Sequence, residues 1–153
     1  MNPSPVRPGE RLRTQLTVSN PGTSPLNSVI LTARVPQEVD DASGYTGFDE
    51  ALLSNGGNCD RGLPYSNYCD FGDLMTWNLG TLQPGRGATV SAPLPVATGT
   101  EAGRQIALEM LVTAAGDIRS SLETTAGTDP DSPLLLEIDD SADPVLADAN
   151  YTY

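Results

Sequence analysis

Two cysteines carry the clearest chemistry in this chain. Cys59 and Cys69 stand ten positions apart in a stretch rich in Gly, Asn, Asp and Pro. Two cysteines are too few for a structural zinc site, and the chain has no histidine to complete one. Because the surrounding residue types are typical of a loop, we predict a Cys59–Cys69 disulfide, with two free thiols as the alternative. A disulfide would place the protein in an oxidising compartment, so the expected location is extracellular or cell-surface.

Clustered carboxylates are the second candidate group. From Ser120 onward the chain has eight acidic residues and no basic one. Calcium prefers such oxygen ligands, and Asp139, Asp140 and Asp143 are the best candidates for a calcium site. The spacing lacks the Asp-x-Asp-x-Asp-Gly pattern of a calcium loop, so a solvated acidic run is the alternative. Calcium is the one cofactor that the sequence suggests.

Aromatic residues form the third group. Most of them fall in a long connection, residues 37–73, where Tyr45, Tyr65 and Tyr68 are candidates for binding a ligand. An exposed row of these tyrosines would suit a carbohydrate-binding module. Alternatively, the connection caps one end of the domain, with Phe48 and Phe71 as a small satellite core.

Missing residue types restrict the remaining chemistry. The chain has 20 acidic residues, eight arginines, no lysine and no histidine, for a net charge of −12. Nucleic acid is an unsuitable partner because its phosphates would be repelled. A Ser-His-Asp triad, a Schiff-base lysine and a P-loop are all excluded. Carboxylate pairs at 49/50 and 70/73 are the remaining catalytic option, and for so small a domain we predict that the protein is not an enzyme.

Alternation of apolar and polar residues dominates the chain, and helical periodicity is scarce. Apolar faces with a period of two predict strands at residues 12–18, 29–35, 75–79, 90–96 and 106–112, with weaker ones at 120–125 and 134–138. Pro93 and Pro95 within one of these runs predict an edge strand or a bulge. Residues 49–54 are compatible with a single helical turn.

Short strands, 13 prolines and 15 glycines together predict an all-β protein, an immunoglobulin-like antiparallel β-sandwich of about seven strands. We expect two sheets to bury the alternating apolar faces between them, with Trp77 at the centre of the core.

Three segments carry a resemblance to a known family. They are Pro8-Gly9 with the run Leu16-Thr17-Val18-Ser19-Asn20-Pro21-Gly22, the strand at 29–35 with Pro36, and Trp77-Asn78-Leu79-Gly80-Thr81-Leu82-Gln83-Pro84-Gly85. Their order resembles the conserved immunoglobulin-like repeat of bacterial and archaeal extracellular proteins known as domain of unknown function eleven. Residues 134–153 resemble the start of a following repeat. The resemblance implies a surface or secreted repeat with a structural or adhesive role and no catalytic residues.

A match between the two ends of the chain also indicates a tandem repeat. Pro5-Val6 recurs as Pro144-Val145, an offset of 139 residues, and a turn-prone stretch and a period-two segment follow each copy. We therefore divide the chain into a sandwich repeat at 1–128 and an acidic junction with the first strand of the next repeat at 129–153. No strand like the one at 134–138 precedes Pro5, so this segment is a candidate donor or completing strand.

These features predict a non-catalytic structural or adhesive repeat of a secreted or cell-surface protein, acting as a spacer or assembly module in a stalk or filament. The expected partners are neighbouring repeats or copies of the chain, held by β-strand contacts. No apolar run approaches the roughly 20 residues of a membrane span. The alternative function is a carbohydrate- or protein-binding module that uses the disulfide loop at 37–73.

Overall fold

The computed structural model describes residues 1, 5–39, 47–60, 68–116 and 118–128, and these form an all-β protein as predicted. All pairs between its strands are antiparallel. The strands are β1 (Arg11–Ser19), β2 (Leu26–Arg34), β3 (Phe48–Asp49), β4 (Asn58–Asp60), β5 (Tyr68–Cys69), β6 (Leu74–Leu82), β7 (Gly87–Pro95), β8 (Gln105–Ala114) and β9 (Ile118–Gly127). Two short 3-10 turns, η1 (Glu50–Leu52) and η2 (Ser54–Gly56), follow β3.

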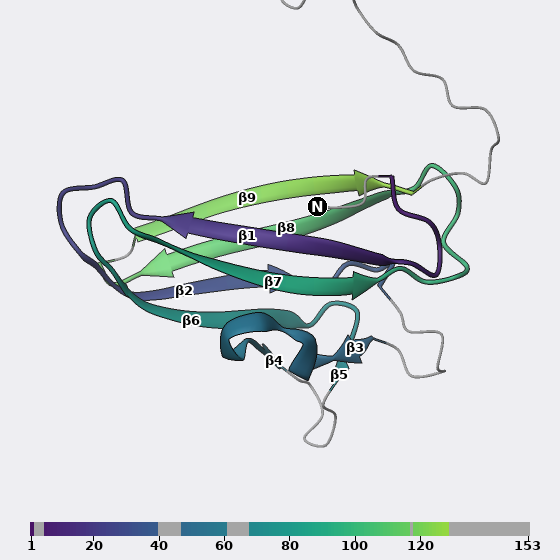
Figure 1. The fold of residues 1–153 in the computed structure, drawn as a ribbon, viewed down its shortest axis with the longest axis horizontal. Helices are drawn as coiled ribbons and strands as arrows, with labels where there is room; N and C mark the ends of the chain where they lie inside the picture. Colours follow the sequence, from purple (N-terminus) through teal and green to yellow (C-terminus); the bar gives the residue numbers. More distant parts are fainter. Residues whose placement is uncertain (2–4, 40–46, 61–67, 117, 129–153) are drawn as a thin grey trace, which may run out of the picture.

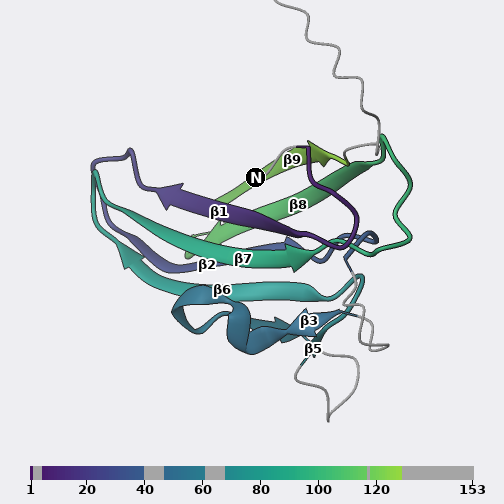
Figure 2. The same cartoon turned by 45° about the vertical axis from the view of Figure 1, so that its right-hand side comes forward.

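Two sheets of unequal width face each other (Figures 1 and 2). The wide sheet has five strands in the order β4-β6-β2-β8-β9, and the narrow sheet pairs β1 with β7. A two-stranded ribbon of β3 and β5 lies beside the β4 edge of the wide sheet. Seven of the nine strands therefore belong to the two main sheets.

The core lies between the two sheets and follows the predicted alternation. Trp77 on β6 is fully buried, as expected of its central position, and its indole Nε1 donates a hydrogen bond of 3.0 Å to the carbonyl of Ser54. The helical turn expected at 49–54 is η1, where the Asp49 side chain accepts a hydrogen bond of 2.9 Å from the amide of Ala51.

The expected burial of the alternating apolar faces holds for most strands but not along the whole of β8. Ile106 and Leu108 at the start of β8 are buried, but Met110 and Val112 further along the same face are only half-buried. On the neighbouring β9, Leu122 remains 67% exposed. The reason is the width of the narrow sheet, since β1 is its last strand and nothing described lies beyond it to cover β8 and β9.

The prolines of β7 mark an edge strand, as predicted. Along its length β7 pairs with β1 alone, and an isolated bridge joins Val39 to Val96 just beyond its end. Pro93 and Pro95 are thus tolerated because one side of the strand carries no ladder of hydrogen bonds.

The long connection at 37–73 contains more structure than a loop. It holds β3, β4 and β5 as well as both 3-10 turns. Phe48 on β3 is buried, but it belongs to the same hydrophobic cluster as the core between the sheets, so it does not form a satellite core. Phe71 was predicted to share that core, and this was wrong, because Phe71 lies in the turn after β5 and is 61% exposed.

The first and last described segments meet. The amide of Val6 donates a hydrogen bond of 3.0 Å to the carbonyl of Gly127, and Val6 forms a parallel bridge with Thr128. The predicted junction and strand at 129–153 lie outside the described residues, so the domain boundary at 128 stays a prediction.

Candidate functional site

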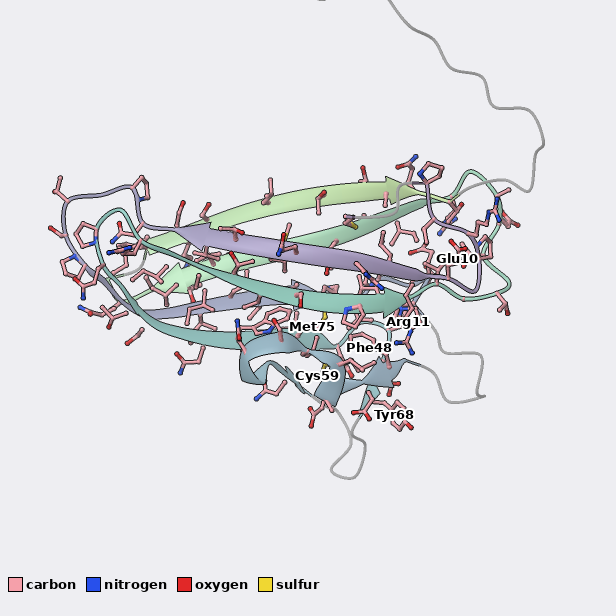
Figure 3. The ribbon with its side chains drawn as sticks, viewed as in Figure 1. Glu10, Arg11, Phe48, Cys59, Tyr68 and Met75 are labelled. Atoms are coloured by element: carbon pink, nitrogen blue, oxygen red, sulfur yellow. A yellow bond between two sulfur atoms is a disulfide. The ribbon has the colours of Figure 1, made fainter. Side chains whose placement is uncertain are left out.

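The predicted disulfide is present between Cys59 and Cys69, whose Cα atoms are 5.5 Å apart. Cys59 lies on β4, which pairs with β6 of the wide sheet, and Cys69 lies on β5, which pairs with β3. The bond therefore attaches the β3–β5 ribbon to the edge of the wide sheet. Both cysteines are buried, and Figure 3 shows Cys59 close to Phe48 and Met75.

The candidate ligand-binding tyrosines are described only in part. Tyr68 on β5 is half-buried and lies at the outer side of the ribbon (Figure 3), near the exposed Phe71 in sequence. Tyr45 and Tyr65 lie outside the described residues, so the row of three tyrosines stays a prediction.

The carboxylates of this connection hold its turns. Asp49 caps η1, and an oxygen of Glu50 accepts a hydrogen bond of 3.4 Å from the amide of Cys59. An oxygen of Asp73 accepts a bond of 2.9 Å from the amide of Asp70. Backbone amides thus donate hydrogen bonds to acids of both candidate catalytic pairs.

A second surface, which the sequence reasoning had not located, opens between the two sheets beside β1. We call it the inter-sheet groove. It has a volume of about 600 Å³. Residues 14–19 of β1 form one wall, Met110, Val112 and Ala114 of β8 with Ile118, Ser120, Leu122 and Thr124 of β9 form the floor, and Met1 also lines it. The groove is therefore largely apolar.

One wall of the groove is an open strand edge. In the β1–β7 register, Gln15 lies opposite Ser91 and Thr17 opposite Thr89. The amide of Ser91 and the carbonyl of Thr89 point away from β1, toward Ser54 and Asn55. In an antiparallel pair, the backbone N–H and C=O groups of two opposite residues point either toward each other or both away from the partner strand. The N–H and C=O groups of Gln15 and Thr17 therefore point outward, to the free edge of β1.

The other edge of the narrow sheet is closed. The Oγ of Ser54 accepts a hydrogen bond of 2.7 Å from the amide of Ser91, and the Nδ2 of Asn55 donates one of 2.9 Å to the carbonyl of Thr89. The prolines at 93 and 95 occur in the same alternating set and have no amide hydrogen to offer. Among the described residues, one edge of the narrow sheet is thus blocked, and no strand pairs with the free edge of β1. In the sequence, the mixture of apolar and polar residues on the inner face of β9 is the signal that this face is left uncovered.

The predicted calcium ligands Asp139, Asp140 and Asp143 lie outside the described residues. Within the described ranges, no group of three or more His, Cys, Asp or Glu side chains is arranged to hold a metal ion. The same part of the chain has no helix of the length and apolarity that crossing a membrane requires.

Comparisons with known proteins show no family. No family model matches the chain, and no curated protein matches it either. The resemblance to the extracellular repeat therefore stays a prediction. A solved structure described as "AvmM Catalyzes Macrocyclization in Alchivemycin A Biosynthesis" is 13% identical, covers 86% of this chain and 88% of its own, and has a TM-score of 0.46. At that level of likeness it supports no conclusion about the fold or the activity of this chain.

Proposed function

We propose that this chain is a non-catalytic structural module of a secreted or cell-surface protein, and that it acts in assembly through contacts with neighbouring repeats or with copies of itself. One observation carries the proposal, namely the apolar inter-sheet groove beside the open edge of β1. Contiguous exposed apolar surface commonly marks an interaction site. An unpaired strand edge offers backbone donors and acceptors to another chain.

The buried disulfide supports the location in this proposal. Disulfides persist in oxidising compartments, and Cys59–Cys69 is enclosed by the core rather than presented for exchange. The acidic residues Asp139, Asp140 and Asp143 would then lie at the junction with a neighbouring unit, where calcium could stiffen the array.

Light scattering and sedimentation velocity on the non-reduced chain test the assembly role. The measured mass should rise with protein concentration, because an exposed apolar groove and a strand edge are buried when copies associate. Adding calcium and then a chelator would show whether the ion strengthens the contact. A mass that stays at 16.0 kDa over the whole concentration range would contradict the assembly function.

Exposed Phe71 favours one second candidate, a binding module built on the disulfide-bearing connection. An exposed aromatic ring beside a braced ribbon suits stacking on a sugar ring or packing on a protein partner. Affinity electrophoresis in gels that contain soluble polysaccharides would test the first possibility. Sugar binding through Phe71 would be established if the gel retards the wild type, if Phe71→Ala abolishes the retardation, and if Leu52→Ala, at an exposed residue on η1, leaves it unchanged. Equal mobility of all three proteins would exclude these polysaccharides as ligands.

A further inference from the structure

We infer that residues 134–138 of a second copy of this chain dock as a strand in the inter-sheet groove, beside the free edge of β1. The inference rests on the proposed assembly function and specifies its contact surface. The occupant would add a third strand to the narrow sheet and cover the uncovered inner face of β8 and β9.

The apolar floor of the groove matches the pattern of this segment. Met110, Val112 and Leu122 belong to the inner face of the wide sheet, yet they are left half-buried or exposed. In residues 134–138 the side chains of Leu134, Leu136 and Ile138 fall on one face of an extended chain. Covering the groove with three large apolar side chains would remove this surface from water in both partners.

The edge of β1 can pair with the backbone of the segment. β1 is nine residues long, pairs with β7 without a bulge and contains no proline. The outward-pointing set that contains Gln15 and Thr17 also includes Arg13, which lies opposite Pro93. These residues present successive donors and acceptors, as strand addition requires.

Charge favours the acidic tail as the occupant. Arg11 and Arg13 are exposed on the outer face of β1. Glu137 alternates with the apolar residues of the segment, so it would fall on that same outer face. Asp139 and Asp140 follow directly. Opposite charges on adjacent strands stabilise their pairing.

The direction of the chain favours a second copy over the molecule's own tail. The repeated Pro-Val aligns Val145 with Val6, an offset of 139 residues. The same offset aligns Asp140 with Met1, so residues 134–138 correspond to positions just before Met1. In the structure Met1 lines the groove, whereas Val6 lies beside Thr128. A strand that led through the groove toward the position of Met1 would therefore run antiparallel to β1.

The molecule's own tail would have to enter the groove from the other end. β9 ends at the end of the sandwich where β1 begins (Figures 1 and 2), and Thr128 bridges Val6 just beyond β9. A tail that entered the groove directly from Thr128 would therefore run parallel to β1. Parallel pairing is slightly less stable per residue than antiparallel pairing. A second copy can supply the same segment in the antiparallel direction.

Peptide binding to the full chain tests the groove separately from assembly. The probe is a synthetic peptide of residues 133–141, and the receptor is the Leu136→Asp chain, whose own segment is disabled. We expect saturable binding, with slower hydrogen exchange at the amides of Arg13, Gln15 and Thr17. A peptide carrying Leu136→Asp should bind at least about tenfold more weakly because it would bury a charge, whereas one carrying Leu135→Asp should bind almost normally.

Matched receptor variants locate the contact. Leu122→Asp in the groove should weaken binding at least about tenfold. Leu111→Asp makes the same change on the outer face of β8, where Leu111 is also exposed, and should leave binding intact. Because both leucines are exposed, neither change should lower the melting temperature by more than a few degrees.

The outcomes separate the groove from the assembly function. Absence of peptide binding, or equal binding by Leu122→Asp and Leu111→Asp, would overturn the inference. If the unmodified chain then still self-associated, assembly would use another surface and the proposed function would stand. Peptide binding together with a strictly monomeric unmodified chain, its β1 edge amides already protected, would place the molecule's own tail in the groove and overturn the second-copy assignment.

Discussion

Gly57 is the residue on which the central tryptophan depends. It follows η2 and lies directly against the Trp77 ring, so that a Cβ at this position would overlap the indole nitrogen. The same short segment supplies the Ser54 carbonyl that accepts the indole N–H. A side chain at 57 would therefore disturb both the packing and the hydrogen bond of the largest core residue.

We predict that Gly57→Ala lowers the free energy of unfolding by about 1–3 kcal/mol, the usual cost of overpacking a filled core. Urea denaturation followed by Trp77 fluorescence would measure it. Gly99→Ala is the matched control, because no atom lies within 4 Å of a Cβ at that position. Similar stabilities of the two variants would show that the contact with Trp77 is not restrictive.

At the scale of elements, the disulfide adds a covalent link to a ribbon that packs on the core mainly through Phe48 and Cys69. β3 and β5 have two residues each, and they contact the wide sheet mainly through β4. The bond closes a loop of ten residues between β4 and β5. Without it, the packing of Phe48 would remain as the principal apolar contact of the ribbon with the core.

Replacing both cysteines by alanine should lower the free energy of unfolding by about 2–4 kcal/mol, since the unfolded chain regains the freedom that the crosslink removes. Urea denaturation of the double variant and of the wild type, each with and without reductant, would measure the loss. Reductant should shift the wild-type midpoint and leave that of the double variant unchanged. Coincident curves for the non-reduced proteins would contradict the prediction.

The closed edge of β7 gives a second prediction at this scale. Ser54→Ala removes the acceptor of the Ser91 amide and should cost about 1 kcal/mol while speeding hydrogen exchange at Ser91. Ser121→Ala, on the exposed face of β9, is the control and should change neither quantity. Unchanged exchange at Ser91 in Ser54→Ala would mean that another group protects this amide.

At the scale of the whole molecule, charge opposes the proposed assembly at long range. Copies with a net charge of −12 repel one another. We predict that added sodium chloride strengthens self-association, because it screens this repulsion more than it weakens the short contacts of a docked strand. Sedimentation velocity at a series of salt concentrations would measure the effect. Association that weakens with salt would instead point to contacts made chiefly of ion pairs.

Much of this architecture could be predicted from alternation, because a strand buried on one face must repeat every second residue. The strands at 12–18, 75–79 and 106–112 and the central Trp77 follow from it. How much of the wide sheet is covered by the narrow sheet could not be predicted. Met110 and Val112 continue the pattern of Ile106 and Leu108, although no described strand of the narrow sheet lies over them. The alternation predicts which face of the sheet a side chain points to, but it does not predict how wide the opposing sheet is.

The candidate sites were predictable to a smaller degree. The disulfide could be predicted because the two cysteines lie ten residues apart in a loop-like stretch and no histidine is present to complete a zinc site. The structure contains this disulfide. The strands β3, β4 and β5 could not be predicted, because two or three residues are too few to show a period. The exposure of Phe71 follows from its place in the turn after β5, a position that hydrophobicity does not reveal.

The contact between Val6 and Gly127 has a consequence for how the chain can be rearranged. Because the first and last described segments touch, a short linker could join residue 128 to residue 5 and close the backbone into a ring. New termini could then be opened in the turn at residues 20–25, which lies at the opposite end of the sandwich (Figure 1). Such a circular permutant would keep every sheet contact of the domain while changing the order in which the strands emerge during synthesis. The same proximity would allow the domain to be inserted into a surface loop of a host protein without forcing the ends of that loop apart.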